Sequence, residues 1–145
     1  MKKIAIIGSR SFSKSEESLR MLEEKMSKVL ERLSERYENV CVVSGGQPKG
    51  ADGMAKKLAL QNNFVYKEFP PAHYRHNQYC VKSKEHYSQK YHVSNFFARN
   101  SEIIEYSDIV IAFIPATITI QQSKGTYDSI KKAKKLNKRF KIIKV

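Results

Sequence analysis

The chain has 145 residues, of which 41% are hydrophobic, and carries a formal net charge of +13. This length suits one core, so we expect a single domain over residues 1–145. No apolar run approaches the roughly 18 residues that a membrane span needs, and the first run breaks at Gly8, too early for a signal peptide. The composition therefore favours a soluble, cytoplasmic protein with no membrane partner.

The first third of the chain predicts a strand, a long helix and a second strand. The β-branched apolar run at 3–7 is typical of a buried strand. Ser13, with Glu16 three residues later, forms a capping pattern. It precedes an amphipathic helix at about 16–37, whose apolar residues recur at helical spacing. The apolar run at 40–44 predicts the second strand.

The rest of the chain continues this alternation after a second helix. The expected elements are, in order, a helix at 50–61, a strand at 64–69, a helix at 95–106, a strand at 109–114, a helix at 126–136 and a strand at 140–145. Alternating strands and helices imply a parallel sheet that is covered on both faces. The sequence therefore predicts an α/β fold, a single Rossmann-like three-layer domain with a mostly parallel sheet of about five strands. It does not fix the strand order.

Four glycine-containing segments lie between a predicted strand and the helix that follows it. They are Gly8-Ser9-Arg10, Ser44-Gly45-Gly46, Lys49-Gly50-Ala51-Asp52 and Lys124-Gly125-Thr126. Ligands of open α/β sheets bind at the carboxyl ends of the strands, and helix N-termini there attract phosphate. The segments fit neither the dinucleotide fingerprint nor the Walker loop, because the glycine and lysine spacings differ. Each of them is also compatible with an ordinary turn or helix cap.

Three polar side chains add to these segments. Arg99 and Asn100 fall in the early turns of the helix at 95–106, where an arginine can clamp a phosphate or simply lie on the surface. Asp52 can cap its helix or accept a hydrogen bond from a ribose hydroxyl. Spacing alone leaves both choices open.

Taken together and in this order, the segments resemble the SLOG superfamily. That group unites the Smf/DprA DNA-processing proteins and the LOG nucleoside-monophosphate phosphoribohydrolases, and the likeness is strongest to its small YspA-like branch of bacterial and phage proteins. The matching segments are Ile6 to Phe12, Val43 to Gly46, Gly50 to Asp52 with Ala55, Phe69 to Ala72, Ala98 to Asn100, Ser107 to Phe113 and Lys124 to Thr126. The resemblance implies a Rossmann-like sheet and a pocket for a nucleotide or nucleotide-derived ligand. By this resemblance the pocket would be lined by Gly8, Ser9, Arg10, Ser44, Gly45, Gly46, Gly50, Asp52, Arg99, Asn100, Gly125 and Thr126.

One departure from the LOG pattern concerns catalysis. LOG enzymes carry a Pro-Gly-Gly-x-Gly-Thr-x-x-Glu motif whose glutamate takes part in glycosidic cleavage, and Ser129 stands at that position here. Asp128 lies one residue earlier, which turns it about 100° away on a helix. No catalytic residue is therefore assigned, and Asp52 and Asp128 remain the weak candidates for a general acid or base.

The stretch at about 70–94 is a long basic aromatic loop with no clear period. It interleaves tyrosines and basic residues with all four histidines of the chain. Such a loop can stack a base, close over a pocket, or pack as a surface excursion. The histidines lack a metal-ligand spacing, and Cys41 and Cys80 are too far apart in sequence to suggest a metal or disulfide framework. We therefore predict no metal and no cofactor.

Three functions follow from these observations. The favoured one is binding of a nucleotide-derived small molecule, with a signalling molecule as one candidate, because the phosphate segments are present without a full catalytic set. The first alternative is a hydrolase that cleaves an N-glycosidic or phosphate bond of such a molecule. The second alternative is a DprA-like nucleic-acid-binding protein, which the net charge supports. Related proteins often form dimers, so a homodimer is a further expectation.

Overall fold

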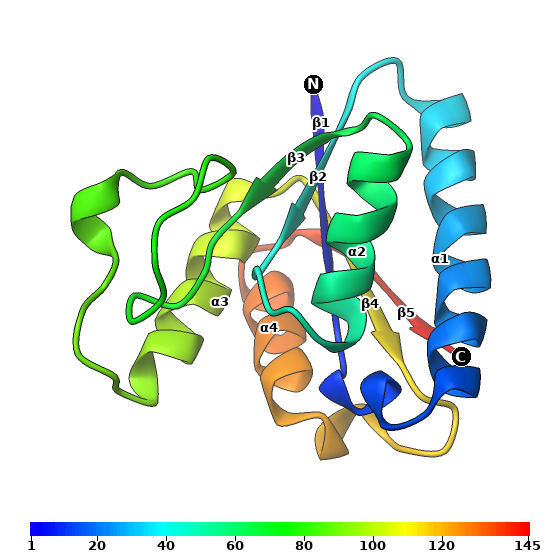
Figure 1. Cartoon of the computed structure of the whole chain (residues 1–145). Coiled ribbons are helices and arrows are strands. Elements are labelled where there is room, and N and C mark those ends of the chain that lie inside the picture. Colours follow the sequence, from blue (N-terminus) through cyan, green and yellow to red (C-terminus); the bar gives the residue numbers. More distant parts are fainter.

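Five parallel strands form one sheet in the order β3-β2-β1-β4-β5 (Figure 1). The computed structural model describes all residues, 1–145. The strands are β1 (Lys2–Gly8), β2 (Val40–Ser44), β3 (Val65–Glu68), β4 (Ile109–Ile114) and β5 (Arg139–Lys144). The sheet confirms the predicted α/β, Rossmann-like fold and supplies the strand order that the sequence left open. The chain runs outward from β1 to β3 on one side, then returns to β4, so the order reverses between β1 and β4.

Four helices cover the two faces of this sheet (Figure 1). They are α1 (Glu16–Arg36), α2 (Gly50–Gln61), α3 (Ser94–Tyr106) and α4 (Lys124–Lys135). On one face Leu22 and Met26 of α1 are fully buried with Leu58 of α2 in a core of 18 residues. On the other face Ile103 of α3 and Ile130 of α4 belong to a core of 11 residues. None of the four helices is long and apolar enough to cross a membrane.

The start of α1 differs from the prediction, and the difference matters for the site. Residues Arg10–Lys14 form a short 3-10 helix, η1, whose N-cap is Ser9. The cap of α1 is Ser15, whose side chain accepts a hydrogen bond from the amide of Ser18 at 3.1 Å. The prediction that Ser13 caps this helix was therefore wrong. Its Oγ instead accepts a hydrogen bond from the amide of Gly50 at 2.7 Å.

Helix α4 begins two residues earlier than predicted. Its first turn therefore already contains Gly125 and Thr126. It ends just before Asn137, which has a left-handed backbone (φ 56°), a common way for a helix to stop. The two other short helices are η2 (Lys84–His86) and η3 (Ile120–Gln122).

The long loop between β3 and α3 projects from the body of the molecule (Figure 1). Its base is pinned to the last residue of β3, because the Glu68 amide donates to the carbonyl of Tyr79 and the Val81 amide donates to the carbonyl of Glu68. The Glu68 carboxylate is 1% exposed and accepts hydrogen bonds from Tyr66 and Asn77. The Nζ of Lys56 lies 3.1 Å from Oε1 of this carboxylate and forms an ion pair with it. A buried carboxylate with three partners makes this end of the loop a defined structure rather than a free flap.

Candidate ligand-binding site

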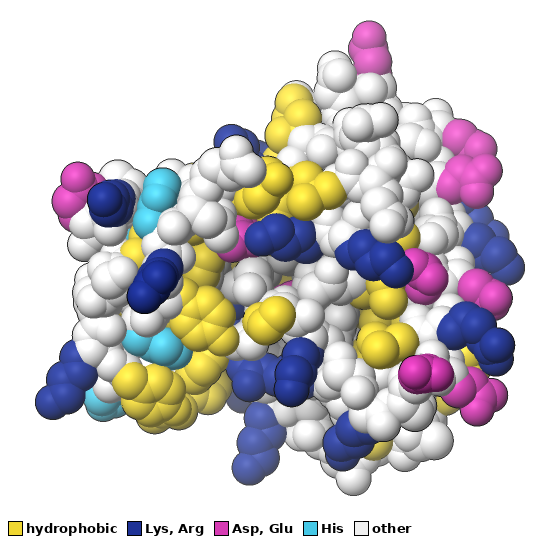
Figure 2. Space-filling view, viewed as in Figure 1, with side chains coloured by type: hydrophobic (Ala, Val, Ile, Leu, Met, Phe, Trp, Pro, Cys, Tyr) yellow, Lys and Arg dark blue, Asp and Glu magenta, His cyan; other side chains and the backbone are white.

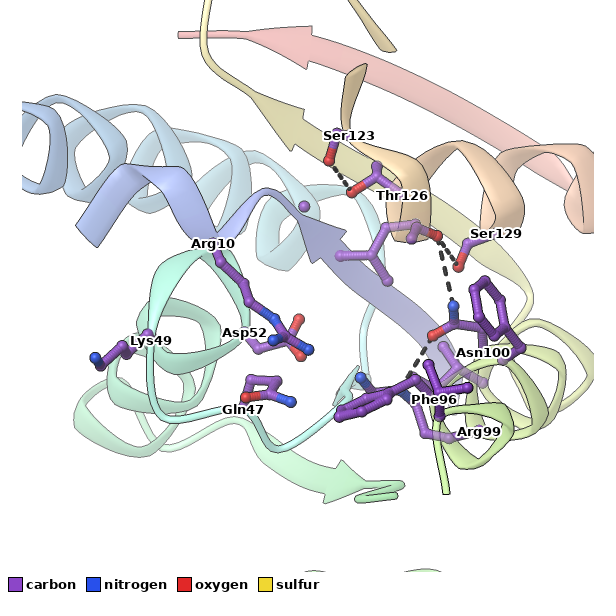
Figure 3. A pocket seen from close by; sticks show the side chains of 16 residues that line it. Arg10, Gln47, Lys49, Asp52, Phe96, Arg99, Asn100, Ser123, Thr126 and Ser129 are labelled. Carbon is purple, nitrogen blue, oxygen red and sulfur yellow. Dashed lines mark hydrogen bonds between the residues drawn. The ribbon is translucent and has the colours of Figure 1, made fainter. Parts of the chain in front are cut away.

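A pocket of about 370 Å³ opens at the carboxyl ends of the strands, where the order of the sheet reverses (Figure 3). Its floor is the end of β1, at Ile7 and Gly8. The walls come from η1, the loop before α2, the first half of α3 and the first turn of α4. Crevices at such reversal points are the usual ligand sites of open α/β sheets.

The structure brings seven of the twelve residues expected at the site onto the pocket wall. These are Gly8, Arg10, Asp52, Arg99, Asn100, Gly125 and Thr126. The other five lie behind the wall, and they are Ser9, Ser44, Gly45, Gly46 and Gly50. They do not reach the wall because their polar groups bond other parts of the protein and their backbones pack closely against neighbouring segments.

The β2–α2 loop, residues 44–50, packs its predicted phosphate-binding groups against its own neighbours. The Ser44 hydroxyl hydrogen-bonds Tyr66 Oη at 2.7 Å in the core. The Gly45 carbonyl accepts a hydrogen bond from Arg99 Nη1 at 2.5 Å. A Cβ on Gly46 would lie 2.9 Å from the buried carboxylate of Glu68. This loop is therefore occupied by protein contacts.

The start of α2 is likewise closed by η1. The amide of Gly50 donates to Ser13 Oγ, and the amide of Ala51 donates to the carbonyl of Ser9 at 3.3 Å. Gly50 has a left-handed backbone (φ 67°), and a Cβ there would lie 2.5 Å from the carbonyl oxygen of Ser9. Gly50 is thus needed for the close contact of two loops.

The start of α4 is open by comparison. The amides of Lys124, Gly125 and Thr126 make no hydrogen bond to the backbone, and the N-cap Ser123 makes no side-chain cap bond. The Ser123 hydroxyl donates instead to Thr126 Oγ1 at 2.8 Å. A Cβ on Gly125 would meet no atom within 4 Å. Unpaired amides and the positive end of the helix dipole therefore face the pocket, and both attract an anion.

Arg99 links α3 to the ends of two strands. Its guanidinium is 7% exposed and donates to the carbonyl of Gly45, with a longer contact of 3.4 Å to that of Phe69. Its Nε donates to the Asn100 side chain at 3.0 Å. Burial lowers the pKa of this guanidinium, and the carboxylate of Asp52 opposes that shift. Arg99 therefore braces the wall of the pocket, which the sequence did not reveal.

Arg10 is the freer cation of the site. It is exposed, and its guanidinium lies 5.1 Å from the centre of the Phe96 ring. Figure 3 shows it reaching over the pocket toward Asp52. An arginine in this position can move onto a bound anion, since it has no ion pair of its own.

Several wall residues were missed by the sequence reasoning. They are Ile7, Gln47, Lys49, Val93, Phe96, Phe97, Ile103, Ser123 and Ser129. Helical spacing could have found Phe96 and Ile103, which lie three residues before and four residues after Arg99. Ser129 could have been found four residues after Gly125. No signal in the sequence pointed to Gln47, which lies in an irregular loop.

Gln47 is the least satisfied polar side chain of the wall. It is 8% exposed, and its Oε1 accepts a hydrogen bond from Tyr74 Oη at 3.1 Å. Its Nε2 is buried and has no partner. Buried donors are nearly always paired in proteins, so an unpaired one at a pocket wall points to a group supplied by a ligand or a water molecule.

The carboxylates of the two weak catalytic candidates lie in different settings. Asp52 is the single acidic residue on the pocket wall. Burial raises the pKa of its carboxyl, and the Arg99 guanidinium opposes this. Asp128 is not on the wall and pairs with Lys132 at 2.8 Å on the surface of α4. Ser129, at the position of the LOG glutamate, does face the pocket, and its hydroxyl donates to the carbonyl of Gly125 at 3.2 Å.

The long loop contributes to the rim of the site through its aromatic residues. His73 contacts the rings of Tyr91 and Phe96 edge to face, at 4.8 and 5.1 Å between ring centres. Tyr87 is buried within the loop, and Tyr91 is 63% exposed. No group of three or more His, Cys, Asp or Glu side chains is placed to hold a metal ion.

The charge of the surface differs between the two sides of the molecule. Figure 2 shows Lys and Arg side chains near the centre of the view, beside a cluster of hydrophobic side chains. Most of the acidic side chains in this view lie at the edge formed by α1. The pocket wall itself carries three basic residues, Arg10, Lys49 and Arg99, and one acidic residue, Asp52, which favours an anionic ligand.

Comparison with known proteins agrees with this architecture. A family model described as "YspA, cpYpsA-related SLOG family" matches residues 2–76, which is more than half of the chain. The matched part contains β1 to β3 and therefore the floor of the pocket and the β2–α2 loop. A search of curated proteins finds no match. The chain belongs to the YspA, cpYpsA-related SLOG family.

Proposed function

We propose that the protein binds a phosphate-bearing nucleotide derivative in the pocket between β1, α3 and the start of α4. The observation that carries this proposal is the open first turn of α4, with three unpaired amides beside a space that Gly125 leaves free. Membership of the SLOG family supports a nucleotide-related ligand at the same place.

The phosphate would lie at the start of α4. The amides of Gly125 and Thr126 would donate to its oxygens, as at other helix N-termini that bind anions. Arg10, without an ion pair, would add a charge-assisted bond from η1. This arrangement binds an anion without using the β2–α2 loop.

The base would lie against the aromatic residues of α3. Phe96 and Phe97 both line the pocket, and Phe97 is 44% exposed. Stacking of a base on an aromatic side chain stabilises a complex by about 1–3 kcal/mol and tolerates different bases. A pocket of about 370 Å³ is also within the range of small-ligand sites, roughly 300–1,000 Å³.

Binding fits this wall better than cleavage in the LOG manner. The position of the LOG glutamate carries Ser129, whose hydroxyl is engaged with the carbonyl of Gly125. Asp128 does not line the pocket, and its carboxylate is held by Lys132 at 2.8 Å and by a longer contact of 3.5 Å from the Asn100 side chain. Asp52 is thus the single carboxylate within reach of a ligand, whereas LOG-type hydrolysis needs an acid at the other wall.

The test is binding of a defined panel to the purified protein. The panel contains the ribonucleoside 5′-monophosphates, ADP-ribose and cyclic dinucleotides, and native mass spectrometry and calorimetry report stoichiometry, Kd and any cleaved product. Gly125→Leu should weaken binding at least about tenfold, because the side chain would fill the phosphate site. Lys135→Leu, at an exposed position on the same helix, is the matched control and should bind like the wild type.

Arg10 gives an independent arm of the same test. Arg10→Ala should weaken binding by about tenfold or more, since a charge-assisted hydrogen bond contributes about 1.5–3 kcal/mol. Arg20→Ala removes the same charge from an exposed position on α1 and should have little effect. Binding of single-stranded DNA without binding of any panel member would contradict the proposal and favour the nucleic-acid alternative.

A further inference from the structure

We infer that Gln47 and Asp52 together recognise the free hydroxyls of a ribose, so that the ligand is a ribonucleotide rather than a 2′-deoxyribonucleotide. This inference rests on the proposed function, because it names the part of the nucleotide that faces one wall of the same pocket. It is carried by two polar side chains of one wall, the buried Gln47 and the partly buried Asp52, whose hydrogen-bonding needs complement one another.

Gln47 supplies a donor that the protein itself does not use. Its side chain is 8% exposed, Tyr74 Oη holds its Oε1 at 3.1 Å, and its Nε2 has no partner. With Oε1 bonded to Tyr74, Nε2 is the free end of the amide. An unpaired buried donor at a pocket wall is best satisfied by an acceptor on the ligand.

Asp52 supplies an acceptor beside this donor. Its carboxylate lies on the same wall, close to Gln47 (Figure 3). A Cβ on Gly45 would lie 2.6 Å from Asp52 Oδ2 and 2.3 Å from Arg99 Nη1, so only a residue with no side chain leaves room for both groups. The Asp52 carboxyl keeps an oxygen that accepts hydrogen bonds whether or not it carries a proton.

A donor and an acceptor on one wall select a group that can accept and donate. A hydroxyl does both, and two neighbouring hydroxyls can bond Gln47 and Asp52 at once. A ribose has such a pair at its 2′ and 3′ positions, whereas a 2′-deoxyribose has lost one member. The missing hydroxyl would leave either the Gln47 amide or the Asp52 carboxyl without its partner on the ligand.

The position of the pair favours the sugar over the base. The amide and the carboxylate lie across the pocket from Phe96, and the open start of α4 forms a third side (Figure 3). With the base on the aromatic side and the phosphate on α4, the sugar is the part of a nucleotide that remains for the third wall. The edge of a base can also donate and accept hydrogen bonds, and the experiment distinguishes recognition of the base from recognition of the ribose.

The experiment measures Kd by calorimetry for four matched pairs. These are AMP and dAMP, GMP and dGMP, CMP and dCMP, and UMP and dUMP. Sites built to bond a hydroxyl reject the analogue that lacks it strongly, so we expect the ribonucleotide of at least one pair to bind at least about tenfold more tightly than its deoxy partner. In Gln47→Met, which keeps the length of the side chain and loses the donor, that ratio should fall to about threefold or less.

Two further variants keep the result interpretable. Gln47→Glu replaces the donor with an acceptor and should also abolish the ratio, whereas Gln61→Glu makes the same change at the exposed end of α2 and should preserve it. Equal binding of both members of every pair, with differences only between bases, would overturn the inference and leave the proposed function standing. Failure of all eight nucleotides and of the earlier panel would contradict the proposed function, and the inference with it.

Discussion

The β2–α2 loop and the start of α4 are both glycine-containing segments at the carboxyl edge of the sheet. The loop is packed against other parts of the protein, whereas the start of α4 is open. In the loop, Gly45 contacts Arg99 and Asp52, Gly46 contacts Glu68, and Gly50 contacts the backbone of η1. At the start of α4, a Cβ on Gly125 would meet no atom within 4 Å, and the neighbouring amides are unpaired. Three glycines close together thus mark tight packing here, whereas a single isolated glycine borders open space at the pocket.

The largest expected effect comes from adding one methyl group to a glycine in each of these two regions. Gly50→Ala places a Cβ 2.5 Å from the Ser9 carbonyl on a backbone that disfavours any side chain. We expect the free energy of unfolding to fall by roughly 3 kcal/mol or more. Gly125→Ala meets no neighbour and lies in a helix, so it should change stability by less than about 1 kcal/mol, in the stabilising direction. Urea unfolding of both variants measures the difference, and equal losses would contradict the contrast.

The packing of the loop also depends on Glu68, which the second prediction tests. Glu68→Ala leaves Tyr66, Asn77 and Lys56 without their shared acceptor. Removing one partner from a buried charged network should lower the free energy of unfolding by about 2–4 kcal/mol. Glu23→Ala removes a comparable ion pair, with Lys57, from the surface and should change it by less than about 1 kcal/mol. A loss for Glu68→Ala as small as that control would show that the network does not hold the loop.

Particular residues show how much of the difference between these two regions could be predicted from the sequence. The helical spacing and the short runs of apolar residues predicted the four α-helices and the five strands, because burial on a parallel sheet imposes both patterns, whereas the three short 3-10 helices were not predicted. The same pattern could not tell which polar groups at the sheet edge would be consumed by contacts between distant segments. Ser13 with Gly50, Arg99 with Gly45 and Glu68 with Asn77 join residues 37, 54 and 9 positions apart. Gly125 and Arg10 were expected at the site for the general reason that they follow strands, whereas Gln47 depends on a contact with Tyr74 that no local pattern encodes.

A third prediction concerns Asp52, on the wall of the pocket. Burial raises the pKa of Asp52 above its ordinary value of 3.8, so the folded protein holds this proton more tightly than the unfolded chain does. The stability that this proton contributes is complete below that ordinary value and is lost as pH rises through the raised pKa. Asp52→Asn has no such proton to lose.

Urea unfolding at a series of pH values measures this effect. The wild type should lose stability relative to Asp52→Asn as the pH rises from about 4 toward neutrality. The opposite trend would mean that attraction to the Arg99 guanidinium outweighs the effect of burial on this carboxyl.

The smallest expected effect concerns Asp128. Its carboxylate is paired with Lys132 and does not face the pocket. Asp128→Asn should therefore change nucleotide Kd by less than about twofold and stability by less than about 1 kcal/mol. A large loss of affinity measured by calorimetry would show that Asp128 takes part in binding, directly or through its contact with Asn100 of the pocket wall.

The most direct test of the contrast uses the six glycines of the chain as reporters. Labelling with ¹⁵N-glycine gives one amide signal for each, and the spectrum is recorded while a ribonucleoside 5′-monophosphate is added. We predict that the signal of Gly125 moves most and that those of Gly45, Gly46 and Gly50 move little, because their surroundings are already filled by protein. A large shift of Gly45 and Gly46 with no change at Gly125 would contradict the account and place the phosphate in the β2–α2 loop.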